Sequence, residues 1–378
     1  MVMMAKAKAM KAKDPTIIDL AGGEPDFATP DKITMEAVRQ LSAGFTHYTV
    51  GTIPELKSAI AEKLSRENGC RYAPEGILVT PGAKYAIYLA VRALVNAGDE
   101  VLYLNPAWVS YGSIIEASGA VPVAVDLRHE DNYRITEALL EEKVTEKTKV
   151  ILLNYPNNPT GRILHRDEFE VLRAFLNRHP GIYAVSDEVY ERIRFDGKES
   201  ISLASDPELL PRVITVNGFS KSVAMTGWRI GYLAAEPSVA AVINKLFQHT
   251  ITTVSGFIQK AAVKAFECGP EIEQMRRRYA QRRDCFVGGL NRIPGVHCEM
   301  PEGAFYAWVR FDMPGMDGEA VSNFILEKAG VVGVPGEAYG EERGSFMRFS
   351  FAASDEALEQ AVIKIERAME EYRNGCKL

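Results

Sequence analysis

Between residues 76 and 235, short apolar runs alternate with amphipathic helical stretches, and this alternation restricts the possible folds more than any other feature of the chain. Strands built almost wholly of valine, isoleucine and leucine are buried on both faces, which is typical of a mainly parallel sheet covered by helices. The order of elements predicts a doubly wound α/β domain. We expect seven strands, at residues 77–80, 100–104, 121–125, 150–153, 183–186, 213–216 and 231–234, and helices at residues 83–95, 108–118 and 166–178.

The character of the sequence changes at about residue 269, where a long charged helix is expected at residues 271–290. Its arginine clusters are predicted to form a solvated helix face. We predict a large domain at residues 30–270 and a smaller α+β domain formed by residues 1–29 and 271–378. The small domain is expected to contain strands near residue 296 and at 304–309 and 346–351, with helices at 318–329 and 354–372.

Composition excludes several functional classes. The formal net charge is −6 and the pI is about 5.7, which argues against a nucleic-acid-binding surface. The five cysteines are scattered and include no CxxC pair, so we expect neither a disulfide framework nor a zinc site. Reduced cysteines are typical of a cytoplasmic protein, which is the location we expect. No apolar run is long enough to span a membrane. The lysine-rich residues 1–13 lack the apolar core of a signal peptide and are expected to form a basic tail.

Polar segments follow four of the predicted strands directly. Ligands of doubly wound sheets bind outside the carboxyl ends of the strands, so we expect these segments to form the functional site. The turn Gly82-Ala83-Lys84 opens a helix and would present backbone N–H groups to an anion such as phosphate, although many βα turns contain glycine. Residues 154–161 are compatible with an ordinary turn, and Asp187 with a helix cap.

The fourth segment contains Lys221, within Asn-Gly-Phe-Ser-Lys at residues 217–221. Most lysines lie on the surface. This one lies between a buried strand and a mostly apolar segment, and a lysine in such a setting can lose its proton and form an imine.

Four motifs occur in a fixed order: Asn-Pro-Thr-Gly at 158–161, Ser-Asp-Glu-Val-Tyr at 186–190, Ser-Lys at 220–221 and Gly-Trp-Arg-x-Gly-Tyr at 227–232. In this order they resemble the class I aminotransferases of fold type I, a pyridoxal-phosphate-dependent family, and are most similar to its bacterial-type aspartate aminotransferase subgroup. The resemblance runs from about Asp19 to the C-terminus. It implies an enzyme that moves an amino group from an L-amino acid to a 2-oxo acid.

The resemblance also implies roles for individual residues. Lys221 would hold pyridoxal 5'-phosphate as a Schiff base and move the substrate proton, while Asp187 would pair with the pyridinium nitrogen. Tyr190 and Asn158 would hydrogen-bond the phenolic oxygen. The remaining cofactor contacts would come from Ser220, Arg229, the turn Gly82, Ala83 and Lys84, and Trp108 stacked on the pyridine ring.

Substrate contacts are implied in the same way. Arg348 would bind the α-carboxylate, together with Gly23, Asn158 and Trp108, although a buried salt bridge would also explain an arginine in an apolar strand. Tyr48 would reach the phosphate of a neighbouring subunit, which implies a homodimer with shared active sites. The segment before Asp19 is shorter than the N-terminal arm that this family normally has.

The identity of the substrate side chain stays open at this point. Lys84 could bind a distal carboxylate, which favours aspartate and 2-oxoglutarate, but a helix-start lysine bound to water or to the phosphate fits equally well. Aromatic amino acids, alanine or kynurenine are alternative donors, and a carbon–sulfur β-lyase is an alternative reaction on the same fold. A pyridoxal-phosphate-binding regulator would need a DNA-binding module, and the 18 residues before Asp19 are too few to encode one.

Overall fold

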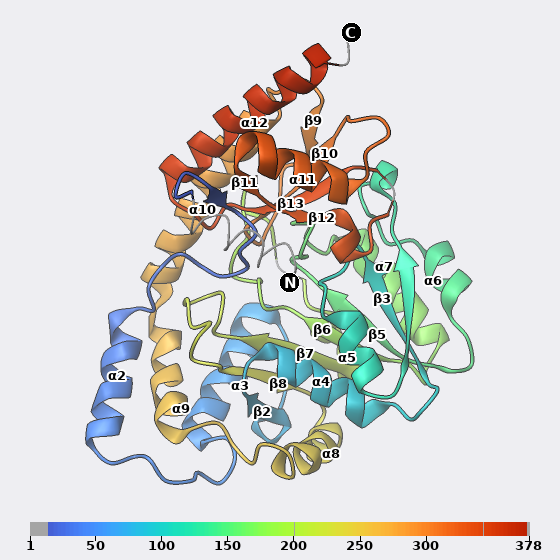
Figure 1. Cartoon of the computed structure of the whole chain (residues 1–378). Helices are drawn as coiled ribbons and strands as arrows, with labels where there is room; N and C mark the ends of the chain where they lie inside the picture. The colour runs from blue at the N-terminus through green and yellow to red at the C-terminus, as the bar shows by residue number, and fades with distance from the viewer. Residues whose placement is uncertain (1–13, 200, 343, 376–378) are drawn as a thin grey trace.

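A seven-stranded sheet of order β2-β8-β7-β6-β5-β3-β4 forms the centre of the computed structural model, which describes residues 14–199, 201–342 and 344–375 (Figure 1). Six strands are parallel, and only β8 runs antiparallel to its neighbours. The predicted mainly parallel, seven-stranded α/β sheet is therefore confirmed. Its strands are β2 (Ile77–Thr80), β3 (Glu100–Asn105), β4 (Val121–Asp126), β5 (Thr148–Asn154), β6 (Tyr183–Asp187), β7 (Val213–Gly218) and β8 (Gly231–Ala234).

Helices cover both faces of this sheet because successive side chains of each strand point to opposite faces. In β5, Val150 and Leu152 pack on one face, whereas Ile151 and Leu153 pack on the other. The first face is covered by α4 (Ala83–Leu94), α5 (Tyr111–Ala117) and α8 (Pro237–Gln248). The second is covered by α3 (Pro54–Asn68), α6 (Glu137–Lys143), α7 (Arg166–Arg178) and α9 (Gly256–Val263).

The helix expected at residues 108–118 begins three residues later, at Tyr111. The preceding loop is held by another part of the chain, because the Ala107 backbone N–H donates to the Tyr339 carbonyl at 2.8 Å. This contact keeps Trp108 in a loop at the carboxyl end of β3.

A second, four-stranded antiparallel sheet of order β12-β13-β10-β9 lies beside the first and forms the upper part of the view in Figure 1. The strand expected at residues 304–309 begins only at Tyr306, because Ala304 has a φ of 57°, outside the extended region. Near the N-terminus, β1 (Ile18–Asp19) pairs with β11 (Val331–Val332) and so joins this part. Its remaining elements are β9 (Val296–Cys298), β10 (Tyr306–Phe311), β12 (Val334–Pro335), β13 (Phe346–Ser350), α10 (Gly269–Leu290), α11 (Gly318–Ala329) and α12 (Asp355–Gly375).

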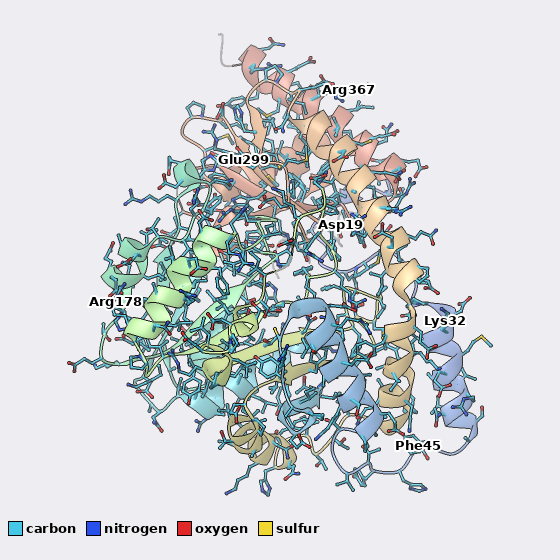
Figure 2. The ribbon with its side chains drawn as sticks, turned by 180° about the vertical axis from the view of Figure 1, so that it is seen from behind. Asp19, Lys32, Phe45, Arg178, Glu299 and Arg367 are labelled. Atoms are coloured by element: carbon cyan, nitrogen blue, oxygen red, sulfur yellow. The ribbon has the colours of Figure 1, made fainter. Side chains whose placement is uncertain are left out.

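The two parts share packing contacts. Trp308 of β10 belongs to the same apolar cluster as the second face of the large sheet, and its indole N–H donates to the Tyr133 hydroxyl at 2.8 Å. Seen from behind, Lys32 lies in the first turn of α2 (Asp31–Ser42), and Phe45 lies in the loop that follows this helix (Figure 2). The helix α2 packs along α9. The domain boundaries at residues 29/30 and 270/271 stay a prediction.

The prediction of a solvated arginine face on α10 is wrong for two of its five arginines. Arg282 and Arg283 are buried, whereas Arg277 is exposed. Arg282 pairs with Asp26 and Asp355 at 2.8 and 3.0 Å. Arg283 pairs with Asp196 and Asp284 at 2.7 and 2.6 Å. These arginines tie α10 to distant segments of the chain.

No helix among the described residues is long and apolar enough to cross a membrane. The same residues contain no group of three or more histidine, cysteine or acidic side chains that could hold a metal ion. The basic segment 1–13 and Cys376 lie outside the described residues.

Candidate active site

A cavity of about 560 Å³ opens at the carboxyl ends of the parallel strands, between the two sheets. The large sheet contributes the residues that follow β2, β3, β5, β6 and β7, and the small sheet contributes Tyr306 and Arg348. Gly22 to Glu24 close the cavity from the N-terminal side. The predicted site residues that line it are Gly23, Ala83, Lys84, Trp108, Asn158, Asp187, Tyr190, Ser220, Lys221, Arg229 and Arg348.

Lys221 follows β7 and extends into the cavity. Its amine donates a hydrogen bond to the Gly23 carbonyl and lies 5.9 and 5.7 Å from the ring centroids of Tyr190 and Phe305. Burial lowers the pKa of Lys221 to about 8, although the negative charge of Glu24 acts in the opposite direction. About a tenth of this amine is therefore unprotonated and nucleophilic at pH 7, far more than for an ordinary lysine.

Asp187 lies at the end of β6 and is almost fully buried. One carboxylate oxygen accepts from the Tyr111 hydroxyl at 2.7 Å, and the other accepts from the Val189 backbone at 3.3 Å. Burial raises the pKa of Asp187 to about 6, and these two hydrogen bonds offset part of the rise. Within the described chain it has no ion-pair partner, so a ligand with a positively charged group would stabilise its ionised form.

An anion site lies where α4 begins. Gly82 precedes the helix with a φ of 87°, and the first turn has neither a capping side chain nor an acidic residue. A Cβ at Gly82 would lie 2.7 Å from the Arg229 guanidinium, so only glycine lets this side chain approach the turn so closely. Arg229 donates to the carbonyls of Thr226 and Pro81 but has no carboxylate partner in the described chain. Free N–H groups and a guanidinium together bind phosphate well.

Arg348 lies deep in the cavity and is 5% exposed. Its guanidinium donates to Asn158 Oδ1 at 3.0 Å and to the Ala21 carbonyl at 2.7 Å, and it lies 4.3 Å from the centroid of the Tyr306 ring. Its Nε has no hydrogen-bond partner. The buried salt bridge considered from the sequence is absent from the described residues. A buried cation without a carboxylate partner is suited to an anionic ligand.

Lys84 and Trp108 lie together at the rim. The Lys84 amine is 4.8 Å from the centroid of the Trp108 ring, which packs edge-on against Tyr111 at 5.4 Å. Lys84 forms no ion pair with any residue that the structure describes. It is a third cation of the cavity, after Arg229 and Arg348, that no carboxylate neutralises.

Tyr48 is not brought to the cavity of its own chain. Its side chain is 91% exposed, although its loop is held by Gln259, which bonds to Ile53 N at 2.9 Å and to Gly51 O at 3.1 Å. Gly82 does not line the cavity either, although it directly precedes Ala83, which does.

Four residues that line the cavity were not predicted from the sequence as site residues: Tyr111, Tyr306, Tyr339 and Glu24. A tyrosine in an apolar strand usually finds a hydrogen-bond partner, and this signal could have singled out Tyr306. Its hydroxyl lies 2.7 Å from that of Tyr190. Glu24 accepts a hydrogen bond from Thr226 at 2.9 Å beside the mouth of the cavity.

Comparisons with known proteins cover nearly the whole chain. A family model described as aminotransferase class I and II matches residues 15–365. The chain is 40% identical over 374 residues to an aspartate aminotransferase of Musicola paradisiaca, covering 98% of this chain and 93% of that protein.

Two solved structures are similar in fold as well as in sequence. An aromatic aminotransferase from Pyrococcus horikoshii has a TM-score of 0.92 and 37% identity, covering 98% of this chain and 99% of that chain. The aspartate aminotransferase of Thermus thermophilus with maleate has a TM-score of 0.91 and 34% identity, covering 97% and 95%.

Proposed function

The chain belongs to the class I and II aminotransferases, and from this premise we propose that it transfers the amino group of aspartate to 2-oxoglutarate with pyridoxal phosphate as cofactor. One observation carries the proposal. Arg229, Arg348 and Lys84 face one cavity, and none of them has a carboxylate partner in the described chain. Three anionic groups of the ligands would neutralise them: a phosphate, an α-carboxylate and a distal carboxylate.

The residues of the cavity fit this cofactor. Its phosphate matches the open N-terminal turn of α4 and the Arg229 guanidinium, with Ser220 beside them. Its ring nitrogen matches Asp187, a buried carboxylate that forms no direct ion pair among the described residues. Lys221, an amine with a lowered pKa, would hold it covalently.

Each of the surrounding side chains would then have a separate chemical role. When bound, the cofactor supplies a ring that withdraws electrons from the substrate Cα. Asp187 would keep the ring nitrogen protonated, and Tyr190 and Asn158 would donate to the phenolic oxygen. Lys221, freed when the substrate amine replaces it, would take the proton from Cα as a general base.

Arg348 would bind the α-carboxylate shared by every amino acid and 2-oxo acid. It is held by Asn158 and the Ala21 carbonyl, and it lies beside the ring of Tyr306, so its orientation is fixed before substrate arrives. Gly23 lies close by, since a Cβ there would meet the Tyr306 hydroxyl at 3.4 Å. The Arg348 site therefore does not select between substrates.

Selection between substrates would depend on Lys84, which lies at the rim of the cavity. An amine over the Trp108 ring can reach a carboxylate on a substrate side chain, which favours aspartate and glutamate. The aspartate aminotransferase from Musicola and the maleate-bound Thermus structure support this preference. An aromatic substrate is the second candidate, because Trp108 and Tyr339 line the cavity and a relative from Pyrococcus is named an aromatic aminotransferase.

We also propose a cytoplasmic homodimer in which Tyr48 completes the phosphate site of the partner. Tyr48 and Val50 are almost fully exposed on a loop that hydrogen bonds hold in place. Next to Arg229 and Lys84, a hollow of about 430 Å³ lined by Tyr85 and Tyr88 opens toward the surface and could receive such a loop.

A donor screen tests the proposed function. Purified protein loaded with pyridoxal phosphate would be given single amino acids with 2-oxoglutarate, and the glutamate formed would be measured. We expect aspartate to be the best donor. Better turnover of phenylalanine or tyrosine would favour the second candidate. Pyruvate released from cystathionine without any oxo-acid acceptor, with no glutamate from any donor, would contradict transamination and indicate a β-lyase.

A further inference from the structure

The hydroxyl groups of Tyr306 and Tyr190, two residues that line the cavity, form an isolated pair. Both side chains are buried, their oxygens are 2.7 Å apart, and their rings meet edge-on at 5.7 Å. Within the part of the chain that the structure describes, each hydroxyl has the other as its hydrogen-bond partner. Two hydroxyl groups that share one hydrogen bond leave one proton over, and that proton is free to be donated to a ligand.

Arg348 determines which tyrosine has the free proton. Its guanidinium lies 4.3 Å from the centroid of the Tyr306 ring, so its positive charge favours Tyr306 as the donor of the shared bond. Burial raises the pKa of Tyr306, and the charge of Arg348 offsets part of that rise. Burial raises the pKa of Tyr190 well above its usual range and Tyr306 raises it further, while the charge of Arg348 offsets a smaller part of that rise. Tyr306 is thus the better donor, and Tyr190 keeps its proton for the cavity.

We propose that Tyr306 is a positioning residue that donates to Tyr190, directs the Tyr190 proton toward the phenolic oxygen of the bound cofactor, and thereby couples that oxygen to the charge of Arg348. The inference rests on the proposed function. A hydroxyl that accepts a hydrogen bond becomes a stronger donor itself, so the contact between Tyr190 and the phenolic oxygen is strengthened. When the phenolic oxygen accepts a stronger hydrogen bond from Tyr190, it attracts the proton on the neighbouring Lys221 nitrogen less strongly. The pKa of that nitrogen is then lower.

Binding of a carboxylate would reverse this effect. A carboxylate at Arg348 neutralises the charge beside the Tyr306 ring and weakens Tyr306 as a donor. Tyr190 then donates less strongly, and the nitrogen that joins Lys221 to the cofactor holds its proton more tightly. Substrate binding would in this way raise the pKa of that nitrogen through two hydroxyl groups, in addition to the direct contact of Arg348 with Asn158.

The test is a spectroscopic pH titration of the loaded protein, without turnover. The visible absorbance of the bound cofactor reports the protonation of the Lys221 nitrogen. We expect Tyr306→Phe to raise its pKa by about half a unit to one unit and Tyr190→Phe to raise it by more. The double variant should match Tyr190→Phe alone, because Tyr306 acts through Tyr190. Phenylalanine keeps the ring that packs against Arg348 and Phe305.

Tyr339→Phe is the matched control, because Tyr339 also lines the cavity and faces Arg348 at 5.2 Å, while its hydroxyl makes no contact with Tyr190. We expect its titration to match that of the wild type. Succinate provides a second readout: it should raise the pKa in the wild type and raise it by less in Tyr306→Phe. Succinate shifts of equal size in these two proteins would overturn the coupling.

Two further outcomes would overturn the inference alone. One is a Tyr306→Phe titration identical to that of the loaded wild type. The other is an effect of Tyr306→Phe that adds in full to that of Tyr190→Phe. A wild type that takes up no pyridoxal phosphate would instead overturn the proposed function, and this inference with it.

Discussion

At the scale of single residues, the cavity is defined by charges without partners. Arg348 and Arg229 have no carboxylate partner in the described chain, and Asp187 forms no direct ion pair there, although the charge of Lys221 acts on it from a distance. Such an arrangement costs stability in the free protein and becomes favourable only when a ligand supplies the missing charges. The loaded enzyme is therefore expected to be more stable than the free one.

Asp187→Asn tests this cost in the cofactor-free protein. The folded-state pKa of Asp187, about 6, lies above its ordinary value of 3.8, so the destabilisation grows as the pH rises through this window and is complete above it. We expect the variant to melt about 2–5 °C higher than the wild type at pH 7.5, with the difference vanishing toward pH 4.

The same substitution should lower kcat of the loaded enzyme roughly 100- to 1000-fold, because a neutral amide cannot keep the ring nitrogen protonated. Differential scanning calorimetry and steady-state kinetics measure the two effects. A variant that melts lower at pH 7.5 and at pH 4 alike would show that Asp187 has a purely structural role.

Lys84→Gln tests the specificity proposed for the rim. Loss of one charged hydrogen bond to a substrate carboxylate should raise KM for aspartate about tenfold and leave KM for alanine nearly unchanged. Lys147→Gln, at an exposed lysine remote from the cavity, is the control. Equal changes in both KM values would assign Lys84 to the phosphate or to solvent.

Residues that directly follow a buried strand could be placed from the sequence. Asp187 ends the buried strand β6 and Lys221 follows the buried strand β7, and the carboxyl ends of these two parallel strands meet at one edge of the sheet. Tyr306 and Tyr111 could not be placed in this way. The position of Tyr306 depends on the register of β10 against β13, and that of Tyr111 on a helix start that a distant backbone contact determines.

At the scale of elements, the positions of the strands along the chain follow from apolar runs, but the order of the strands in the sheet and the contacts between elements depend on long-range pairing. Apart from Asp284, which is adjacent to Arg283, the carboxylate partners of Arg282 and Arg283 lie 73 to 256 residues away, and no local pattern indicates these distant partners. The helical periodicity of α10 consequently predicts a solvated face where the structure has buried ion pairs.

Gly231 of β8 shows how closely two elements must approach at the phosphate site. A Cβ at this position would lie 2.6 Å from Ala83 N and 2.8 Å from Gly82 C, and backbone atoms cannot yield as a flexible side chain can. We expect Gly231→Ala to displace the start of α4, weaken pyridoxal phosphate binding at least tenfold and lower the free energy of unfolding by about 1–3 kcal/mol.

Gly288→Ala is the matched control for this substitution, because a Cβ at Gly288 of α10 would meet nothing within 4 Å. It should be neutral or stabilising, since alanine favours a helix interior. Cofactor titration by fluorescence and denaturant unfolding give the two quantities. Unchanged cofactor affinity in Gly231→Ala would contradict the assignment of the α4 turn to the phosphate.

At the scale of the whole molecule, each active site is proposed to draw on two subunits. Hybrid dimers of Lys221→Ala and Tyr48→Ala test this directly. If Tyr48 serves the partner, one site of the hybrid combines both defects and the other has neither, so about half of the wild-type activity should return. If Tyr48 serves its own subunit, neither site of the hybrid is intact. The activity of the hybrid would then be only that of its Tyr48→Ala sites.

The central claim is that Lys221 carries the cofactor. The loaded protein would be reduced with borohydride, which fixes pyridoxal phosphate to the amine that holds it, then digested and mapped by mass spectrometry. We predict a single modified peptide, with the added mass on Lys221 within Asn-Gly-Phe-Ser-Lys, and no modification in the Lys221→Ala variant. Modification of Lys84 or another lysine with Lys221 left free would contradict the account.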